Sequence, residues 1–514
     1  MAKDFDYIKA ATTMVEKGEY ESALYYYFLA RKTSPSDDVD LSIANVYLAM
    51  GLYDEALKFY IRAYAVCKEN EDAVKGIVFC LRDRDSNAAY YYLHYVLNEN
   101  AREDVGFDYE EYEEMPRLAV HDRRDKSELM EKAYELIEKG DFVEAENIFS
   151  SVASESYQYA DALVGRATLR MDEAKADEAQ AFALEAIGVS PNHVGAHVIM
   201  IMVCDSKGDK LRMDEWAQRL YALDSKAEDD VIKIALCLCT YGYYSLAEKY
   251  VLRRLEFAPY DKLMLLNLLN IHMSNGNVDK AYKVANKVNV IYPEDVEIKE
   301  LTARLLKGGD SKMPSELFAF RREWTENIKN LFMSEGAFTQ PEHIMWVKWL
   351  LSSEEYIFLQ SAVCAFVTGM PEYDDILDEV LIDPLAHQMI KKQILLRRAC
   401  DKRTEKVEFV VSNIFRSLKV EHPQVAENLE FAYYYVFAFL AVMDFDFEKG
   451  LSQAIKKMAQ KFDNASEQDR GELSLNALAA HLYLLARGGK VKAALELFEC
   501  SEEEFKKAAT VLDI

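Results

Sequence analysis

Cysteine and long apolar runs are both scarce in this chain. The 514 residues include eight cysteines, scattered mostly within apolar stretches, whereas a disulfide framework needs cysteines at dense, regular spacings. The most apolar run, 431–443, is too short and too rich in tyrosine to span a bilayer, and no apolar leader follows MAKDFDYIKA. We therefore expect a cytoplasmic protein with reduced core thiols and no membrane partner.

Positive charge is the second shortage. Lys and Arg number 61 against 88 Asp and Glu, which gives a formal net charge of -27. A surface that binds phosphates needs concentrated cations, so this balance disfavours nucleic acid and anionic membranes as partners. We expect negligible DNA affinity at physiological salt.

Catalytic motifs are also lacking. The chain has no G-x-S-x-G, H-E-x-x-H, Walker A or G-x-G-x-x-G sequence. Three close pairs consist of residue types that serve as ligands or catalytic groups: His193 and His197, Asp374 and Asp378, and Cys237 and Cys239. The His and Asp pairs are four residues apart and can share a helix face, whereas the two cysteines, two apart, point to different faces. Helix packing or a solvated helix face explains each pair more simply, so we expect no enzyme activity, cofactor or metal. An enzyme site built from distant residues of the C-terminal region is an alternative.

What the sequence does contain is a repeat, with a period of about 34 residues, between Lys126 and Pro293. A small residue marks each step at Gly140, Ala174, Gly208, Gly242 and Gly276. Prolines keep the register at Pro191, Pro259 and Pro293, with Ser225 where one is missing, and alanines keep it at Ala145, Ala179, Ala247 and Ala281. This period is typical of a solenoid whose units bury their apolar faces against one another.

Each unit has the pattern of two helices. Val231, Ile234 and Leu238 have helical spacing, Gly242 interrupts the run, and a second run continues to Pro259. Glycine tolerates the positive φ of a tight turn, and proline ends the second helix. We therefore predict that Gly208, Gly242 and Gly276 occupy equivalent turns between paired helices.

These units resemble the tetratricopeptide repeat, whose second helix carries A-x3-F. The matching segments are Ala145-x3-Phe149, Ala23-x3-Tyr27 and Ala56-x3-Tyr60. The chain departs from the family pattern because no repeat has its tryptophan and Met213 replaces one alanine. The resemblance covers about residues 4–306 and implies an all-α, right-handed solenoid that binds proteins or peptides.

The register divides the chain into four regions. Residues 1–100 hold two clear repeats and a degenerate third, in which Asp85 replaces the glycine. Residues 101–125 form an acidic, aromatic connector, either a solvated linker or a segment that docks in a groove or binds a basic partner. Five repeats and a capping helix fill 126–310, and 311–514 is helical without a repeat, with one small hairpin within 405–420.

In the tetratricopeptide family the first helices line a concave groove. The corresponding columns of this sequence are apolar at most positions and contain no Lys or Arg, which favours an amphipathic helix or peptide as ligand. The family's carboxylate clamp is not expected, because Ile8 and Thr12 stand where it needs Lys and Asn. The predicted groove residues are Met130, Tyr134, Val164, Met171, Val198, Met202, Ile232, Leu236, Cys239, Leu266, Asn270 and Met273.

We conclude from the sequence that the chain is a non-catalytic interaction scaffold or adaptor with a protein or peptide partner. The chain's own C-terminal helices or the connector are an equally good occupant of the groove. A second hypothesis is a regulator that contacts DNA through residues 495–512, which resemble a helix-turn-helix with a capping box from Ser501 to Glu504. Carboxylates at 502–504 have the wrong sign for a recognition helix, so a terminal helical hairpin is favoured.

Overall fold

The computed structural model describes residues 6–97, 126–138, 140–307, 317–332, 341–352, 357–443 and 447–512. The chain forms two units, of which unit 1 contains Met1–Phe107, Pro293–Val296 and Thr325–Ile514, and unit 2 contains Asp108–Tyr292 and Glu297–Trp324. The N-terminal repeats thus group with the C-terminal region in unit 1, although the repeat pattern of the sequence separates them. The expected connector, 101–125, lies outside the described residues.

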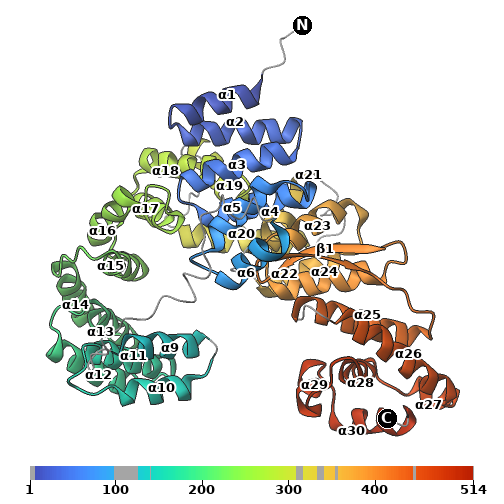
Figure 1. The fold of residues 1–514 in the computed structure, drawn as a ribbon. Coiled ribbons are helices and arrows are strands. Elements are labelled where there is room, and N and C mark those ends of the chain that lie inside the picture. The colour runs from blue at the N-terminus through green and yellow to red at the C-terminus, as the bar shows by residue number, and fades with distance from the viewer. Residues whose placement is uncertain are drawn as a thin grey trace. The chain divides into compact units, whose positions relative to one another are not determined.

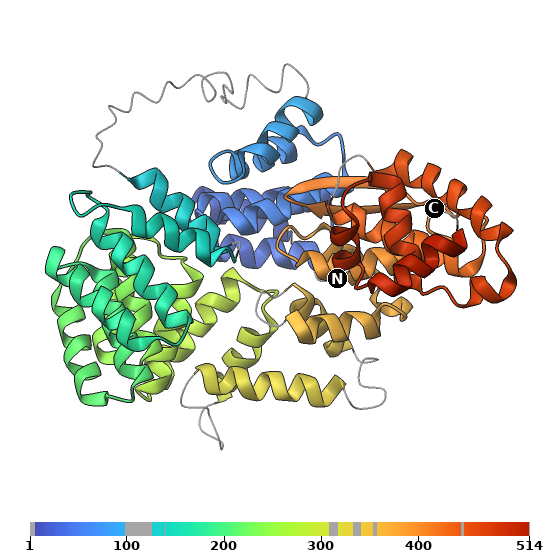
Figure 2. The same cartoon turned by 90° about the horizontal axis from the view of Figure 1, so that it is seen from below.

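Unit 2 is a tetratricopeptide-type solenoid of antiparallel helix pairs (Figures 1 and 2). Its helices are α9 (Ser127–Glu138), α10 (Phe142–Ser151), α11 (Tyr159–Asp172), α12 (Ala176–Val189), α13 (Val194–Ser206), α14 (Lys210–Ala222), α15 (Glu228–Thr240), α16 (Tyr244–Phe257), α17 (Lys262–Ser274) and α18 (Val278–Ile291). Helix α19 (Val296–Lys307) and the first half of α20 (Leu317–Phe332) complete it. The predicted fold class is confirmed.

The turns within these pairs follow the period of the sequence. Gly208, Gly242 and Gly276 have φ of 66°, 77° and 68°, so the prediction that they form equivalent turns is confirmed. Ala174 takes the same left-handed conformation with φ of 57°. A residue with a Cβ adopts it at a cost of roughly 1–2 kcal/mol, so the fold imposes the turn even where the sequence has no glycine.

Contacts between neighbouring pairs depend on small residues. Ala145, Ala179, Ala247 and Ala281 are all fully buried where helices cross. The ring of Phe149 lies against Gly165 of the next repeat, where an added Cβ would approach Phe149 Cζ to 2.6 Å. The aromatic residue of the A-x3-F pattern therefore joins one repeat to the next.

Unit 1 begins with the N-terminal repeats. Their helices are α1 (Tyr7–Glu16), α2 (Tyr20–Thr33), α3 (Asp37–Ala49), α4 (Tyr53–Val66), α5 (Glu71–Leu81), α6 (Ser86–Tyr91) and the π-helix η1 (Tyr92–Val96). At the degenerate third repeat, Asp85 caps α6 by accepting a hydrogen bond from Ala88 N at 3.1 Å. A cap thus stands where the other repeats have their glycine turn.

The C-terminal part of unit 1 is helical apart from one hairpin. Its elements are α21 (Pro341–Leu351), α22 (Ile357–Val367), η2 (Pro371–Tyr373), α23 (Asp374–Ile382), α24 (Gln388–Cys400), β1 (Lys406–Val411), β2 (Ile414–Lys419), α25 (Glu427–Met443), α26 (Glu448–Asn464), α27 (Glu467–Gly471), α28 (Leu475–Arg487), α29 (Val491–Leu497) and α30 (Glu502–Leu512). None of the helices in the described part of the chain is long and apolar enough to cross a membrane.

The hairpin confirms the strand prediction for 405–420. Strands β1 and β2 pair antiparallel from Lys406 with Lys419 to Val411 with Ile414. Ser412 and Asn413 form the turn with φ of 46° and 59°, the double positive φ of a type I′ turn. The buried Tyr92 hydroxyl of η1 donates to Asn413 O at 3.1 Å and accepts from Phe415 N at 2.8 Å. The hairpin is thereby fixed to the end of the N-terminal repeats.

Candidate interaction surface

The predicted groove residues lie on the first helix of each pair in unit 2. Helices α11, α13, α15 and α17 each contact the next, so the first helices of these pairs lie side by side. Six of them pack against the core and keep part of their surface exposed; we call these six the apolar row. They are Val164, Met171, Val198, Met202, Ile232 and Leu236.

The remaining predicted residues differ in exposure. Tyr134, on α9, is 44% exposed and packs edge to face against Phe149 with ring centroids 5.5 Å apart. Leu266 is partly buried, whereas Met130, Cys239, Asn270 and Met273 are buried. Burial raises the pKa of the Cys239 thiol to about 12, so this thiol stays protonated and acts as a core residue.

The first residue of helix α20 contacts α17 at the predicted groove residue Asn270. The Asn270 side chain accepts a hydrogen bond from the backbone N of Leu317, the first residue of α20, at 2.8 Å. Leu317, Phe320 and Trp324 are all buried. Phe320 and Trp324 lie three and seven residues after Leu317, so the three side chains share one face of α20. An amphipathic helix of the chain itself therefore begins at the predicted groove residue Asn270.

A polar contact accompanies these apolar ones. Arg321 of α20 donates through Nε to the Glu297 carboxylate at 2.8 Å, and Glu297 is buried. Arg304 of α19 bonds Glu323 at 3.0 Å and lies over the Phe320 ring. Helix α20 is thus held by apolar side chains together with arginine pairs, the combination by which amphipathic helices bind in grooves.

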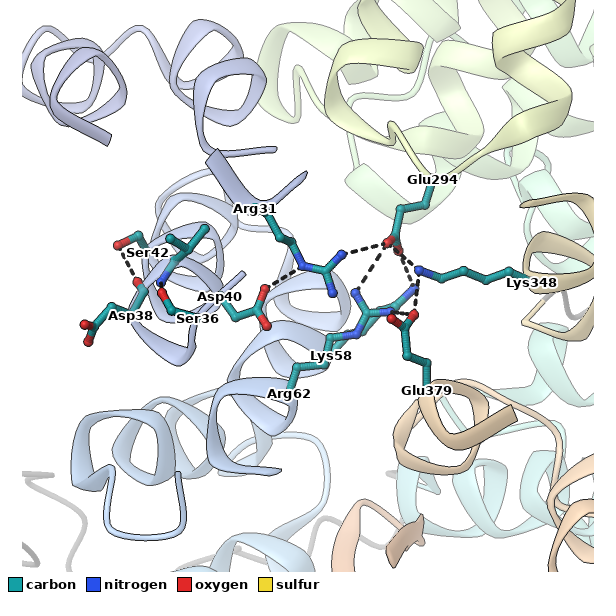
Figure 3. Close-up of polar contacts among 11 residues, drawn as sticks. Arg31, Ser36, Asp38, Asp40, Ser42, Lys58, Arg62, Glu294, Lys348 and Glu379 are labelled. Atoms are coloured by element: carbon teal, nitrogen blue, oxygen red, sulfur yellow. Dashed lines mark hydrogen bonds and ion pairs between the residues drawn. The ribbon is translucent and has the colours of Figure 1, made fainter. Parts of the chain in front are cut away.

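Unit 1 contains a buried ionic cluster that sequence reasoning missed (Figure 3). The side chains of four cations point towards the Glu294 carboxylate, with N to O distances from 2.9 to 3.7 Å. These cations are Arg31, Lys58, Arg62 and Lys348. Burial alone would raise the pKa of the Glu294 carboxyl, but the cations outweigh it, and the pKa lies well below its ordinary value.

Three more carboxylates balance the cluster. Arg31 binds Asp40 at 2.7 Å, Lys348 binds Glu379 at 2.6 Å, and Lys58 lies 3.3 Å from Asp383. The four cations thus face four carboxylates, so the cluster links α2, α4, α21 and α23 and leaves no excess charge for a ligand. Lys58 and Arg62 lie four positions apart on α4, but their spacing does not identify partners that are distant in the sequence.

The His and Asp pairs considered above as ligands or catalytic groups instead make contacts within and between helices. His193 caps α13 and bonds Asp161 at 2.9 Å, while His197 packs against the Trp216 ring, so the two imidazoles do not converge. Asp374 and Asp378 both bind Arg398, at 2.7 and 2.8 Å. Within the described ranges, no group of three His, Cys, Asp or Glu is placed to hold a metal.

The C-terminal segment does form two helices joined by a tight turn. Helix α29 ends at Leu497, and Glu499 turns the chain with a φ of 48°. The capping box is present, because Ser501 Oγ accepts from Glu504 N at 3.3 Å and Glu504 accepts from Ser501 N at 3.0 Å. Glu502, Glu503 and Glu504 are exposed, so the start of α30 presents negative charge to solvent.

No protein-family model matches the chain, and no curated protein matches its sequence. Among solved structures, yeast Tom70 matches over 99% of this chain and 94% of its own, with 12% identity and a TM-score of 0.30. A tetratricopeptide protein of Thermus thermophilus matches over 35% and 98%, with 15% identity and a TM-score of 0.27. IFIT1, solved with m7Gppp-AAAA, matches over 73% and 79%, with 13% identity and a TM-score of 0.25.

At TM-scores this low, nothing that those proteins bind is carried over to this chain. The fold of the chain is instead established by its own paired helices, its positive-φ turns and its buried crossing alanines. By these features it is a tetratricopeptide-type repeat protein.

Proposed function

We propose that the chain is a non-catalytic interaction scaffold that binds an amphipathic helix of a partner protein along the apolar row. The observation that carries this proposal is the docking of α20, whose first residue bonds Asn270 of α17, on the side of the solenoid that the first helices form. The row continues from there over α15, α13 and α11, where its side chains are only partly buried.

The chemistry of the row fits such a ligand. Methionine and leucine side chains adapt to different apolar surfaces, and Met171, Met202 and Leu236 supply them. An amphipathic helix presents anchors at intervals of three, four and seven residues, the spacing with which α20 buries Leu317, Phe320 and Trp324. Among the described residues, α20 meets this side of the solenoid at Asn270, and the six residues of the row stay partly exposed.

The test measures binding of a labelled synthetic peptide with the sequence of residues 317–332 to the full chain. Replacing Met202→Glu and Leu236→Glu together places two unpaired carboxylates under the bound helix, and we expect at least about a hundredfold loss of affinity. A matched control, Leu211→Glu with Phe257→Glu, changes two apolar residues that are 72% and 81% exposed outside the row, and its affinity should be unchanged.

Thermal melting of each variant separates binding from folding. An unchanged melt with lost binding supports the proposal, and retained binding with an unchanged melt contradicts it. If the melt of the double variant collapses, Met202 and Leu236 are core residues, and Met171→Glu then decides. Because Met171 of the row is partly exposed near the end of α11, that variant should fold and bind the peptide at least about tenfold more weakly.

A further inference from the structure

Two carboxylates beside the apolar row have no cation among the residues that the structure describes. Asp172 is the last residue of α11, next to Met171, and Asp205 lies near the end of α13, three residues after Met202. Both are exposed, and Asp205 occupies the position in its repeat that Met171 occupies in the preceding one. The two carboxylates therefore lie at the C-terminal ends of the first helices of two adjacent repeats.

Neither carboxylate stabilises the helix that carries it. The C-terminal end of a helix has a partial negative charge, so a carboxylate in the last turn is electrostatically unfavourable. The nearest cations along the chain are already paired, since Arg170 binds Glu146 at 3.1 Å and Lys207 binds Asp177 at 2.7 Å. Folding thus leaves two unfavourable negative charges beside the partly exposed methionines.

Helix α20 is an example of the kind of ligand that the Asp172 and Asp205 carboxylates can bind. It combines buried apolar anchors with Arg321, whose guanidinium meets the Glu297 carboxylate at 2.8 Å. A helix laid on the row in the same manner would bring a basic side chain on the flank of its apolar face to Asp172 and Asp205. Lys233, an exposed cation of α15, follows Ile232 of the row, so α15 differs in charge next to the row from the ends of α11 and α13.

Resting on the proposed function, we infer that the partner is a basic amphipathic helix, with Lys or Arg flanking its apolar face where it passes Asp172 and Asp205. The carboxylates select the basic helix, and the row supplies the apolar contact. A partner helix with acidic flanks would place like charges together and bind more weakly.

The test uses two synthetic peptides of the same length as α20, each with one apolar face that carries Leu, Phe and Trp at the spacing of α20. One peptide has Lys and Arg on its flanks and the other has Glu. By fluorescence anisotropy with the full chain, we expect the basic peptide to bind at least about tenfold more tightly, and its advantage to shrink as salt rises.

The variant Asp172→Asn with Asp205→Asn should lower the affinity for the basic peptide about fivefold and raise that for the acidic one. It should melt no lower than the original chain, because the substitutions remove charges that oppose the helix dipole. Glu256→Gln, an exposed carboxylate near the end of α16 outside the row, is the matched control and should change neither affinity.

The outcomes separate this inference from the proposed function. If both peptides bind equally and salt has no effect, the inference is overturned while binding by the row stands. If neither peptide binds, the proposed function fails and the inference fails with it. If the variant Asp172→Asn with Asp205→Asn loses affinity for both peptides equally, the inference is also overturned. The carboxylates would then affect the fold of the protein and would not distinguish ligands by their charge.

Discussion

Single residues decide how closely the repeats of this protein pack. The rings of Phe149 and Tyr60 lie against Gly165 and Gly76 of the following repeats. The sequence predicted the aromatic positions from A-x3-F, but not these glycines, because neither belongs to the periodic glycine series. Their role depends on how close two helices approach, which the spacing of residues along the chain does not reveal.

Two glycines of unit 2 give a matched test of this packing. An alanine at Gly165 would put its Cβ 2.6 Å from the Phe149 ring, so Gly165→Ala should destabilise the protein by about 2 kcal/mol. Gly188 of α12 is exposed with no atom near its added Cβ, so Gly188→Ala should stabilise it by about 0.5 kcal/mol. Urea unfolding followed by circular dichroism measures both, and equal effects would contradict the close approach.

Glu294 is the residue on which the ionic cluster of unit 1 depends. The variant Glu294→Gln leaves four buried or half-buried cations with three carboxylates, and should destabilise the protein by about 3 kcal/mol at pH 7. Asp177→Asn, which removes an exposed ion pair with Lys207, is the control and should have almost no effect.

The difference in stability between the original protein and the Glu294→Gln variant should depend on pH in one direction. The pKa of Glu294 is lowered in the folded state, so its stabilising effect is present above the ordinary value of 4.5 and is lost as pH falls further, through the folded pKa. The melting temperatures of the original protein and of the Glu294→Gln variant should therefore differ most at neutral pH and converge below about pH 4.5. A difference that grows on acidification would show that Glu294 is not held ionised by the cluster.

At the scale of elements, local sequence patterns predicted the hairpin and the capped C-terminal helix. The alternation of Val407, Phe409 and Val411 with Ser412 and Asn413 identified the hairpin, because strand period and turn chemistry are both local. The capping box from Ser501 to Glu504 was identified for the same reason. The docking of α20 at Asn270 was not predicted, because an amphipathic pattern shows that a helix has an apolar face and not where that face packs.

The last two helices test the alternative of DNA binding. Helices α29 and α30 are joined by a tight turn, but α30 begins with the exposed Glu502, Glu503 and Glu504. Phosphates repel such a surface, so we predict no shift of duplex DNA at micromolar protein and physiological salt. Sub-micromolar, salt-sensitive binding in a mobility-shift assay would contradict the proposed role and favour the DNA-binding one.

At the scale of the whole molecule, the period of the sequence predicted the solenoid but not the grouping of its parts. Arg62 and Glu294, 232 residues apart, meet in one ionic cluster. Tyr92 holds the hairpin by a hydrogen bond to Asn413, which lies 321 residues further along the chain. Such pairings join residues with no common sequence pattern. The twelve predicted groove residues do lie on the first helices, while their role as a binding surface stays a prediction.

Photo-crosslinking at position 236 tests the central claim most directly. A photoreactive side chain replaces Leu236 in the row in one protein and the exposed Leu211 outside it in another, and each is irradiated with the basic amphipathic peptide. We predict a crosslink from position 236 that mass spectrometry maps to the apolar face of the peptide, and none from position 211. Crosslinking from position 211 and not from position 236 would show that helices bind elsewhere on the solenoid and would contradict the account.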